Sequence, residues 1–131
     1  MQGCWLKNRI PILCLLLMAG AAGSLVADDF PGAVSSFNGF DQFDFELDEV
    51  ACRVVRPKQV AEGRPWIWRA RFWGHEPQTD VALLEKGFHL VYCDVADLWG
   101  NAEAIRRWDR FYAYLTGEHG FSRRPVLEGM S

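Results

Sequence analysis

"FHLVYCDV", residues 88–95, is the stretch that decides the fold class. It is almost continuously apolar over the length of one strand, which predicts a strand covered on both faces, as in a parallel sheet. A short helix is predicted directly before it, over residues 79–86. Thr79 or Asp80 offers an N-cap for this helix, and Gly87 ends it. A helix that leads into a doubly covered strand is typical of α/β proteins.

A second helix and a last strand are predicted downstream. The helix runs from Asn101 to about Thr116, with Gly117 beyond it, and residues 124–129, "RPVLEG", form a short strand. The spacing of apolar residues predicts which side of this helix is buried. That stripe consists of Ile105, Trp108, Tyr112 and Leu115.

Shorter strands are predicted upstream. Apolar and acidic residues alternate over residues 43–48, "FDFELD", which is the period of a half-buried strand, and a β-rich run follows at residues 51–55. A third strand, residues 66–72, is "WIWRARF". Its alternation places the aromatic side chains on one face and Arg69 and Arg71 on the other, which predicts one polar face.

The predicted order is therefore two or three strands, then strand–helix–strand–helix–strand. Alternation of this kind predicts an α/β fold: a three-layer sandwich around a right-handed, mostly parallel sheet. Cys52 and Cys93 fall on strands that this fold places side by side. A disulfide between them and two buried free thiols both remain open.

The amino terminus has the order of a secretory signal peptide. Lys7 and Arg9 precede the apolar residues 10–18, and small residues follow up to Ala27. We expect residues 1–27 to be the signal peptide, with a cut near Gly23 or an uncleaved anchor helix as alternatives. The product would then be exported, to a periplasm or the extracellular space.

Two further segments follow the predicted signal peptide. Residues 28–42 are interpreted as a linker or arm because they carry Pro, Gly, Ser and Asn without a period, and residues 43–131 as the folded domain. Without Lys7 and Arg9, 12 basic residues face 17 acidic ones, a net charge of −5. Such a charge does not favour nucleic acid, and we expect no stable membrane partner after cleavage. The oligomeric state stays open.

No cofactor or metal is expected. His75 and Glu76 stand near Asp80, but no second histidine lies at the spacing of a helical zinc motif. His89 sits in an apolar strand and is interpreted as a core residue, whereas His119 is interpreted as loop surface.

The last residues, Gly129, Met130 and Ser131, follow the final predicted strand. They match the first three places of the nucleophile elbow G-x-S-x-G. In that motif a sharp turn after a strand exposes the serine oxygen, and small residues let the backbone fold that tightly. Ser131 is therefore the candidate nucleophile, with Gly129 and Met130 forming the start of the elbow.

With this motif, residues 45–131 resemble the amino-terminal half of an α/β-hydrolase, the superfamily of serine esterases, lipases and peptidases. The resemblance rests on the order of elements, on "LEGMS", and on the loop "FWGHEPQTD" at residues 72–80. It implies an incomplete α/β-hydrolase fold that ends inside the elbow. It also implies that Trp73 or Gly74 supplies a backbone N–H to an oxyanion hole. In this family the acid and the histidine of the triad follow the serine in the chain.

The leading hypothesis is the amino-terminal part of an exported serine hydrolase that acts on small-molecule esters. His75 and Trp99 are candidate pocket residues. Because the triad acid and histidine are absent, the 131-residue chain alone is predicted to be inactive. Two alternatives stay open. One is a small exported interaction or structural module, in which the Gly-Met-Ser ending is a coincidence, and the other is a natural truncation without function.

Overall fold

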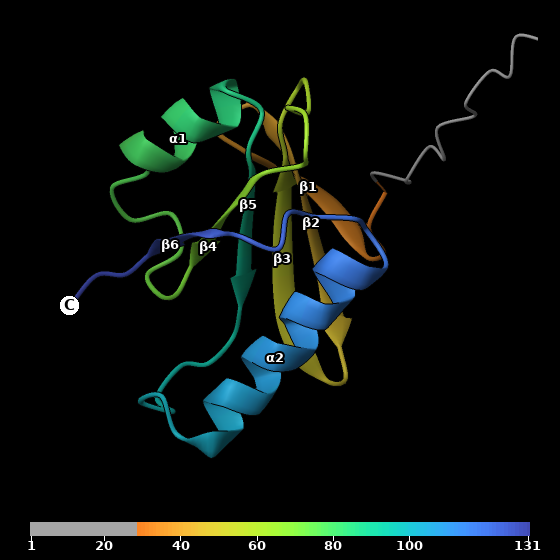
Figure 1. Ribbon diagram of the computed structural model, residues 1–131. Coiled ribbons are helices and arrows are strands. Elements are labelled where there is room, and N and C mark those ends of the chain that lie inside the picture. The colour runs from red at the N-terminus through yellow and green to blue at the C-terminus, as the bar shows by residue number, and fades with distance from the viewer. Residues whose placement is uncertain (1–28) are drawn as a thin grey trace, which may run out of the picture.

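The computed structural model describes residues 29–131. The predicted signal peptide and its cleavage site lie outside these residues. Six strands and two helices make up the described part of the chain (Figure 1). In order they are β1 (Ala33–Phe37), β2 (Phe40–Leu47), β3 (Val50–Arg56), β4 (Trp66–Arg69), α1 (Gln78–Glu85), β5 (His89–Cys93), α2 (Ala102–Gly117) and β6 (Val126–Glu128).

The first three strands form an antiparallel meander joined by two tight turns. Asn38 and Gly39 connect β1 to β2, and Asp48 and Glu49 connect β2 to β3. All four residues have positive φ, which suits two-residue turns of type I′. The interpretation of residues 28–42 as a linker or arm is therefore wrong for β1 and the start of β2, because the Asn-Gly pair closes a hairpin there.

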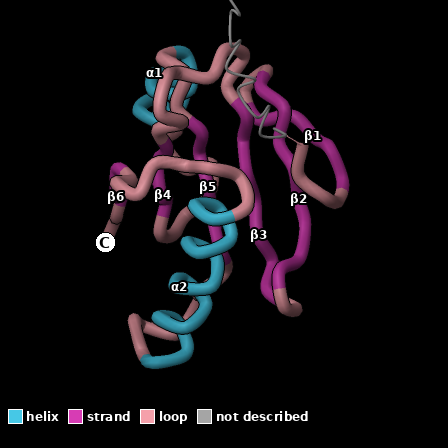
Figure 2. The backbone as a smooth tube through the Cα atoms, turned by 45° about the vertical axis from the view of Figure 1, so that its right-hand side comes forward, coloured by secondary structure: helices cyan, strands magenta, loops and turns pink. Residues whose placement is uncertain are grey.

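All six strands belong to one sheet, in the order β1-β2-β3-β5-β4-β6. Figure 2 shows this order, with β1 and β6 at the two ends. Three of the five pairings are antiparallel (β1–β2, β2–β3 and β3–β5), and only β4–β5 and β4–β6 are parallel. The prediction of a sandwich around a mostly parallel sheet is thus wrong. Two-residue turns can join only antiparallel strands, so half of the sheet lacks the crossovers that parallel pairing requires.

Each face of the sheet packs against one helix. The core consists of two hydrophobic clusters, one on each face of the sheet. Successive residues of one strand belong to different clusters, as with Val54 and Val55 in β3 or Leu90 and Val91 in β5. The α2 side is rich in aromatic rings and includes Phe43, Phe45, Trp66, Phe111, Tyr114 and Leu115. The α1 side is smaller and includes Phe37, Phe40, Val55, Ile67, Leu84 and Leu90.

Helix α1 matches its prediction within a residue or two, but its start differs. Pro77 is the N-cap, and no side chain caps the helix. The side chain of Asp80 is instead completely buried. At the other end Gly87 has φ +88°, and a Cβ there would lie 2.6 Å from the backbone nitrogen of Ala61. Glycine is needed at this turn because both the conformation and the space exclude a side chain.

Helix α2 also matches its prediction, including the cap. The Asn101 side chain accepts a hydrogen bond of 3.0 Å from the backbone N–H of Ala104. The predicted buried stripe is wrong in part, because Ile105 is 45% exposed while Ala104 and Phe111 are fully buried. Small Ala104 allows the helix to approach the sheet, which turns the buried side by about one position.

Strand β4 is shorter than the predicted strand over residues 66–72 and is buried on both faces. It ends at Arg69, and Phe72 already has φ +53°. The predicted polar face does not exist here, because Arg69 is 1% exposed and lies beside fully buried Ile67 on the α1 side. A buried arginine needs partners for its charge, and these lie at the site described below.

The structure pairs Cys52 with Cys93 directly across β3 and β5, as the sequence predicted. Both are buried free thiols, which decides between the two alternatives left open above. Within residues 29–131, no helix has the length and apolar character needed to cross a membrane.

Candidate functional site

The two parallel pairings create a point where the chain changes direction across the sheet. From β4 the chain passes through α1 to β5 on one side, and from β5 it passes through α2 to β6 on the other side of β4. The carboxyl ends of β4 and β6 are therefore neighbours, and the connections that leave β4 and β5 run in opposite directions across the sheet. Open α/β sheets bind ligands outside the carboxyl ends of strands at such a switch point.

A cleft of about 380 Å³ lies at this edge. It is lined by segments that follow all three parallel strands: residues 70–72 after β4, parts of residues 95–100 after β5, and residues 130–131 after β6. Trp108 of α2 adds an aromatic wall. The topology thus brings residues more than 60 positions apart in the sequence to one site, with Ser131 among them.

Ser131 is exposed and has φ +64°. A positive φ is costly for a residue other than glycine, and such conformations gather at functional sites. The strained serine of a nucleophile elbow is one case. Met130, next to it, is 37% exposed and lines the same cleft, as does Trp99, which is 93% exposed. The structure therefore brings three of the predicted site residues together.

The predicted oxyanion residues, Trp73 and Gly74, lie in the loop after β4 but are not among the residues that line the cleft. The ring of Trp73 packs away from the cleft, 5.3 Å from the ring of Phe37 and 5.7 Å from that of Tyr92. Gly74 has φ +75° and is exposed. In the described part of the chain, the N–H groups of Trp73 and Gly74 donate to no other backbone group. His75 is exposed and does not line the cleft.

Beneath this loop lies a buried residue that the sequence interpretation missed. Arg69 ends β4, and its guanidinium group uses its Nε, Nη1 and Nη2 atoms as donors. The acceptors are the carbonyls of Arg71 (3.3 Å), Phe72 (3.1 Å) and His75 and the carboxylates of Asp80 and Glu128 (3.2 Å). The three side chains Arg69, Asp80 and Glu128 are called the Arg69 cluster below.

The Arg69 cluster holds two carboxyl groups for one guanidinium. Burial and a hydrogen bond with Glu128 raise the pKa of Asp80 to about 7, although Arg69 favours its charged form. One oxygen of each carboxyl, Oδ1 of Asp80 and Oε2 of Glu128, is buried without any other hydrogen-bond partner among the described residues. Protonation of Asp80 reduces the excess of negative charge around the single guanidinium group of Arg69.

Two of the three described histidines are far from Ser131. His89 begins β5 and is fully buried, so it lies at the amino ends of the parallel strands, opposite the cleft. His119 follows α2, is 8% exposed, and stacks on Phe30 with 4.1 Å between ring centres. Its interpretation as loop surface is wrong, whereas that of His89 as a core residue is confirmed.

The two aspartates after β5 differ in role. Asp94 accepts hydrogen bonds from the hydroxyl of Tyr92 at 3.1 Å and from the N–H of Ala96 at 3.0 Å, so it shapes the loop. Asp97 lies at the cleft, where its carboxylate is 3.4 Å from Arg71. Both groups of this pair are well exposed, so water screens the attraction between them.

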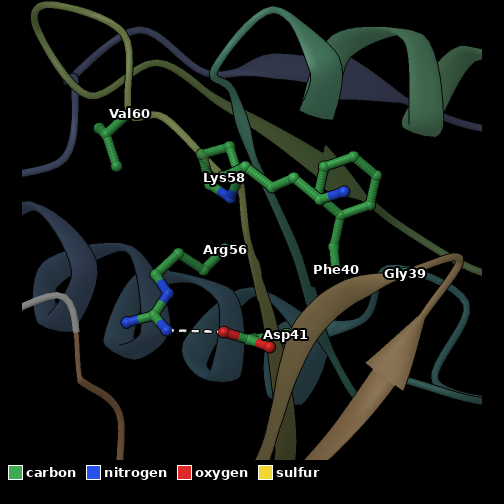
Figure 3. A pocket seen from close by; sticks show the side chains of 7 residues that line it. Gly39, Phe40, Asp41, Arg56, Lys58 and Val60 are labelled. Carbon is green, nitrogen blue, oxygen red and sulfur yellow. Dashed lines mark hydrogen bonds and ion pairs between the residues drawn. The ribbon is translucent and has the colours of Figure 1, made fainter.

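A second hollow of about 450 Å³ lies at the carboxyl end of β3, near the turn between β1 and β2. Figure 3 shows its charged side chains engaged with neighbours. Arg56 binds Asp41 at 2.6 Å, and the ammonium of Lys58 lies 5.5 Å from the centre of the Phe40 ring. Since β3 is antiparallel to β5, the carboxyl end of β3 lies at the amino end of β5. This hollow and Ser131 are therefore at opposite ends of the strands.

Comparisons with known proteins give little beyond this geometry. No protein-family model and no curated protein matches the chain. A solved structure of an enantioselective mutant of epoxide hydrolase from Aspergillus niger, generated by directed evolution, is similar with 19% identity and a TM-score of 0.42. The similarity covers 72% of this chain but 29% of that one. It is a distant likeness to a hydrolase.

Proposed function

We propose that this chain carries the nucleophile-bearing part of an exported serine hydrolase that acts on small-molecule esters. One observation carries the proposal. Ser131, with positive φ, stands at the carboxyl end of β6 and lines a cleft with the segment that follows the neighbouring parallel strand β4. A strained serine at the switch point of parallel strands is the arrangement that an elbow nucleophile requires.

The proposed reaction begins with attack by Oγ of Ser131 on the carbonyl carbon of the ester. As the new C–O bond forms, the hydroxyl proton passes to a base and the carbonyl oxygen becomes an oxyanion. Collapse breaks the bond to the alcohol, which leaves with that proton. Water then attacks the acyl-serine and gives up a proton to the base. Collapse breaks the bond to Oγ of Ser131, which takes that proton back, and the acid is released.

The unpaired N–H groups of Trp73 and Gly74 are the proposed donors to the oxyanion. They belong to the loop after β4, which lies beside the end of β6, and no other backbone group of the described residues uses them. Fixed backbone donors stabilise charge that develops in the transition state, and losing one typically costs about 100- to 1000-fold in kcat.

The base is not provided by the two buried histidines, because His89 and His119 lie at the opposite edge of the sheet. None of the described residues that line the cleft is a histidine. In the family that the sequence resembles, the base and its acid follow the serine in the chain, and the proposal assigns the base accordingly. Residues 1–131 by themselves are then expected to react about four to six orders of magnitude more slowly than a complete triad. Export through a signal peptide at residues 1–27 remains part of the proposal.

One observation favours the alternative of a non-catalytic interaction module. An apolar groove of about 340 Å³ runs between α2 and β6, lined by Trp68, Ile105, Trp108 and Leu127 among others. Leu127 is 75% exposed and Ile105 45%. Exposed apolar surface of this kind is typical of a site that another protein segment covers.

The test is hydrolysis of short-chain 4-nitrophenyl esters by the protein as its native cell produces it. Wild type should hydrolyse the esters, and the Ser131→Ala variant should lose the activity. Ser36→Ala is the matched control, because Ser36 is exposed on the edge strand β1, which β2, β3 and β5 separate from β4 and β6. Equal activity of Ser131→Ala and Ser36→Ala would refute the role of Ser131. No activity in any variant would favour the interaction module.

A further inference from the structure

Arg69 and Glu128 are paired positions on the two parallel strands that end at the cleft. The backbone N–H of the next residue, Ala70, also donates to the carbonyl of Glu128 at 3.0 Å. Glu128 stands three residues before Ser131. The end of β4 and the segment leading to the proposed nucleophile are therefore joined twice, once through the backbone and once through the Arg69 cluster.

The same guanidinium also reaches backward into the loop after β4. Its Nε atom donates to the carbonyl of Phe72 at 3.1 Å, and its Nη2 atom donates to the carbonyl of His75. These two carbonyls enclose Trp73 and Gly74, the proposed oxyanion donors. The amide of His75 in turn donates to the carbonyl of Phe72 at 3.1 Å, so the four residues form one turn closed around Arg69.

The third direction is the helix. Asp80 lies in the first turn of α1 and is completely buried, and its carboxylate accepts from Nη1 of Arg69. The same Nη1 atom donates to Glu128. Asp80 and Glu128 are the only ionisable side chains among residues 29–131 that are paired with Arg69. The guanidinium group thus joins three parts of the fold: the loop after β4 through Nε and Nη2, and α1 and β6 through Nη1.

We propose that Arg69 is a positioning residue, which holds the turn formed by residues 72–75 at a fixed place relative to Ser131, with Asp80 and Glu128 as its counter-ions. This inference rests on the proposed function, because it assigns that turn the oxyanion donors. Only arginine can fill the role, since its rigid fork supplies donors in three directions from one plane. A lysine keeps the charge but offers a single compact ammonium group.

Substitution of Arg69 by Lys tests the inference, with Arg110→Lys as the matched control. Arg110 lies on α2 outside the cleft, is half-exposed, and its ion pair with Asp48 is on the surface. In Arg69→Lys we expect the amide of His75 to exchange with solvent about tenfold faster or more, since the turn loses its fixed centre. We also expect kcat for ester hydrolysis to fall about 100-fold with little change in KM.

Glu128→Gln is a second variant that keeps the volume of the side chain and removes one counter-ion. It covers the case in which Arg69→Lys fails to fold, and it should show the same two effects at smaller size. Unchanged exchange and unchanged kcat in a folded variant would overturn the inference while leaving the proposed function intact. An inactive wild type would overturn the proposed function. The positioning role of Arg69 in catalysis would fall with it.

Discussion

Arg69 and Glu128 face each other across the parallel strands β4 and β6, and Nη1 of Arg69 donates to Oε1 of Glu128 at 3.2 Å. This contact joins the two strands whose ends form the cleft. It also places a positive charge in the interior of the protein, where Arg69 is 1% exposed. The Arg69 cluster therefore connects β4 with β6 and supports the loop of the proposed site.

Arg69→Met should destabilise the fold strongly. Removing the guanidinium leaves the carboxyls of Asp80 and Glu128 without their partner, and breaking a buried pair in this way typically costs about 3–5 kcal/mol. Chemical denaturation followed by circular dichroism measures the free energy of unfolding. Arg71→Met is the control and should change it by about 0.5 kcal/mol at most, as surface substitutions usually do. Equal effects of the two variants would show that the cluster contributes no special stability.

Stability should also depend on pH through Asp80. Burial and the hydrogen bond with Glu128 raise the pKa of Asp80 to about 7 in the folded state, against an ordinary value of 3.8. The folded state therefore binds this proton more tightly than the unfolded state. The stabilisation that protonated Asp80 provides is complete below about pH 4 and is lost as pH rises through about 7. The loss is on the order of 1–4 kcal/mol, since one pKa unit corresponds to about 1.4 kcal/mol.

Denaturation curves for wild type and Asp80→Asn between pH 5 and pH 8 measure this dependence. Wild type should become less stable across this range, and Asp80→Asn should show a flatter profile because the titrating group is gone. Asp44 is a control, since its pKa is lowered by hydrogen bonds to its side chain and not raised. Asp44→Asn should keep the slope of wild type between pH 5 and pH 8. A wild-type slope that survives Asp80→Asn would contradict the assignment.

Alanine substitutions at Gly63 and Gly87 distinguish the cost of backbone strain from the cost of a steric clash. Gly87 and Gly63 both have positive φ, +88° and +76°, but a Cβ at Gly87 would meet Ala61 at 2.6 Å, whereas nothing lies within 4 Å at Gly63. Gly63→Ala should cost about 1–2 kcal/mol from backbone conformation alone. Gly87→Ala should cost clearly more, because the loop before β4 must also move. Thermal denaturation of the two variants measures the stability that each loses. Equal losses would contradict the close approach of Ala61 to Gly87.

The thiols of Cys52 and Cys93 should be protected in the folded protein. Both are buried and face each other across β3 and β5 as free thiols. We expect iodoacetamide to modify neither at native conditions and to modify both after unfolding in guanidinium chloride, because a buried thiol offers the reagent no access. Peptide mapping by mass spectrometry locates the modification. Rapid native labelling of either residue would show that this part of the sheet opens easily.

Local patterns in the sequence predict most of the elements. Alternating Phe43 and Phe45 are buried in β2, and the apolar stretch at residues 88–95 contains β5, whose residues are buried on both faces of the sheet. The Asn101 cap and the length of α2 also agree with the structure. These features depend on residues near each other in the chain, so their period and end signals suffice.

Errors arise where distant residues decide. Alternation predicts a polar face for Arg69. Its burial depends instead on Asp80 and Glu128, which come 11 and 59 positions later and give no local signal. The pairing of β3 with β5 likewise skips β4 in the chain, and no local signal gives its antiparallel direction. The hairpin between β1 and β2 is different. Asn38-Gly39 is a strong hairpin signal, and residues 28–42 were still interpreted as a linker.

The site was found in part for the same reasons. Gly129, Met130 and Ser131 form a local motif, and the loop at residues 72–80 follows a recognisable strand. That both reach one edge of the sheet depends on the position of β4 between β5 and β6. Trp73 shows the limit, because its side chain packs against Phe37 on the α1 side and does not line the cleft.

The most direct test of the central claim is covalent labelling of Ser131. The protein as its native cell produces it is treated with a fluorophosphonate probe, which phosphonylates an activated serine and loses fluoride. Peptide mapping should then find the probe on Ser131 in wild type, and Ser131→Ala should take up none. Absence of label from Ser131, or equal uptake by Ser131→Ala, would show that this serine is no nucleophile and that the cleft serves another purpose.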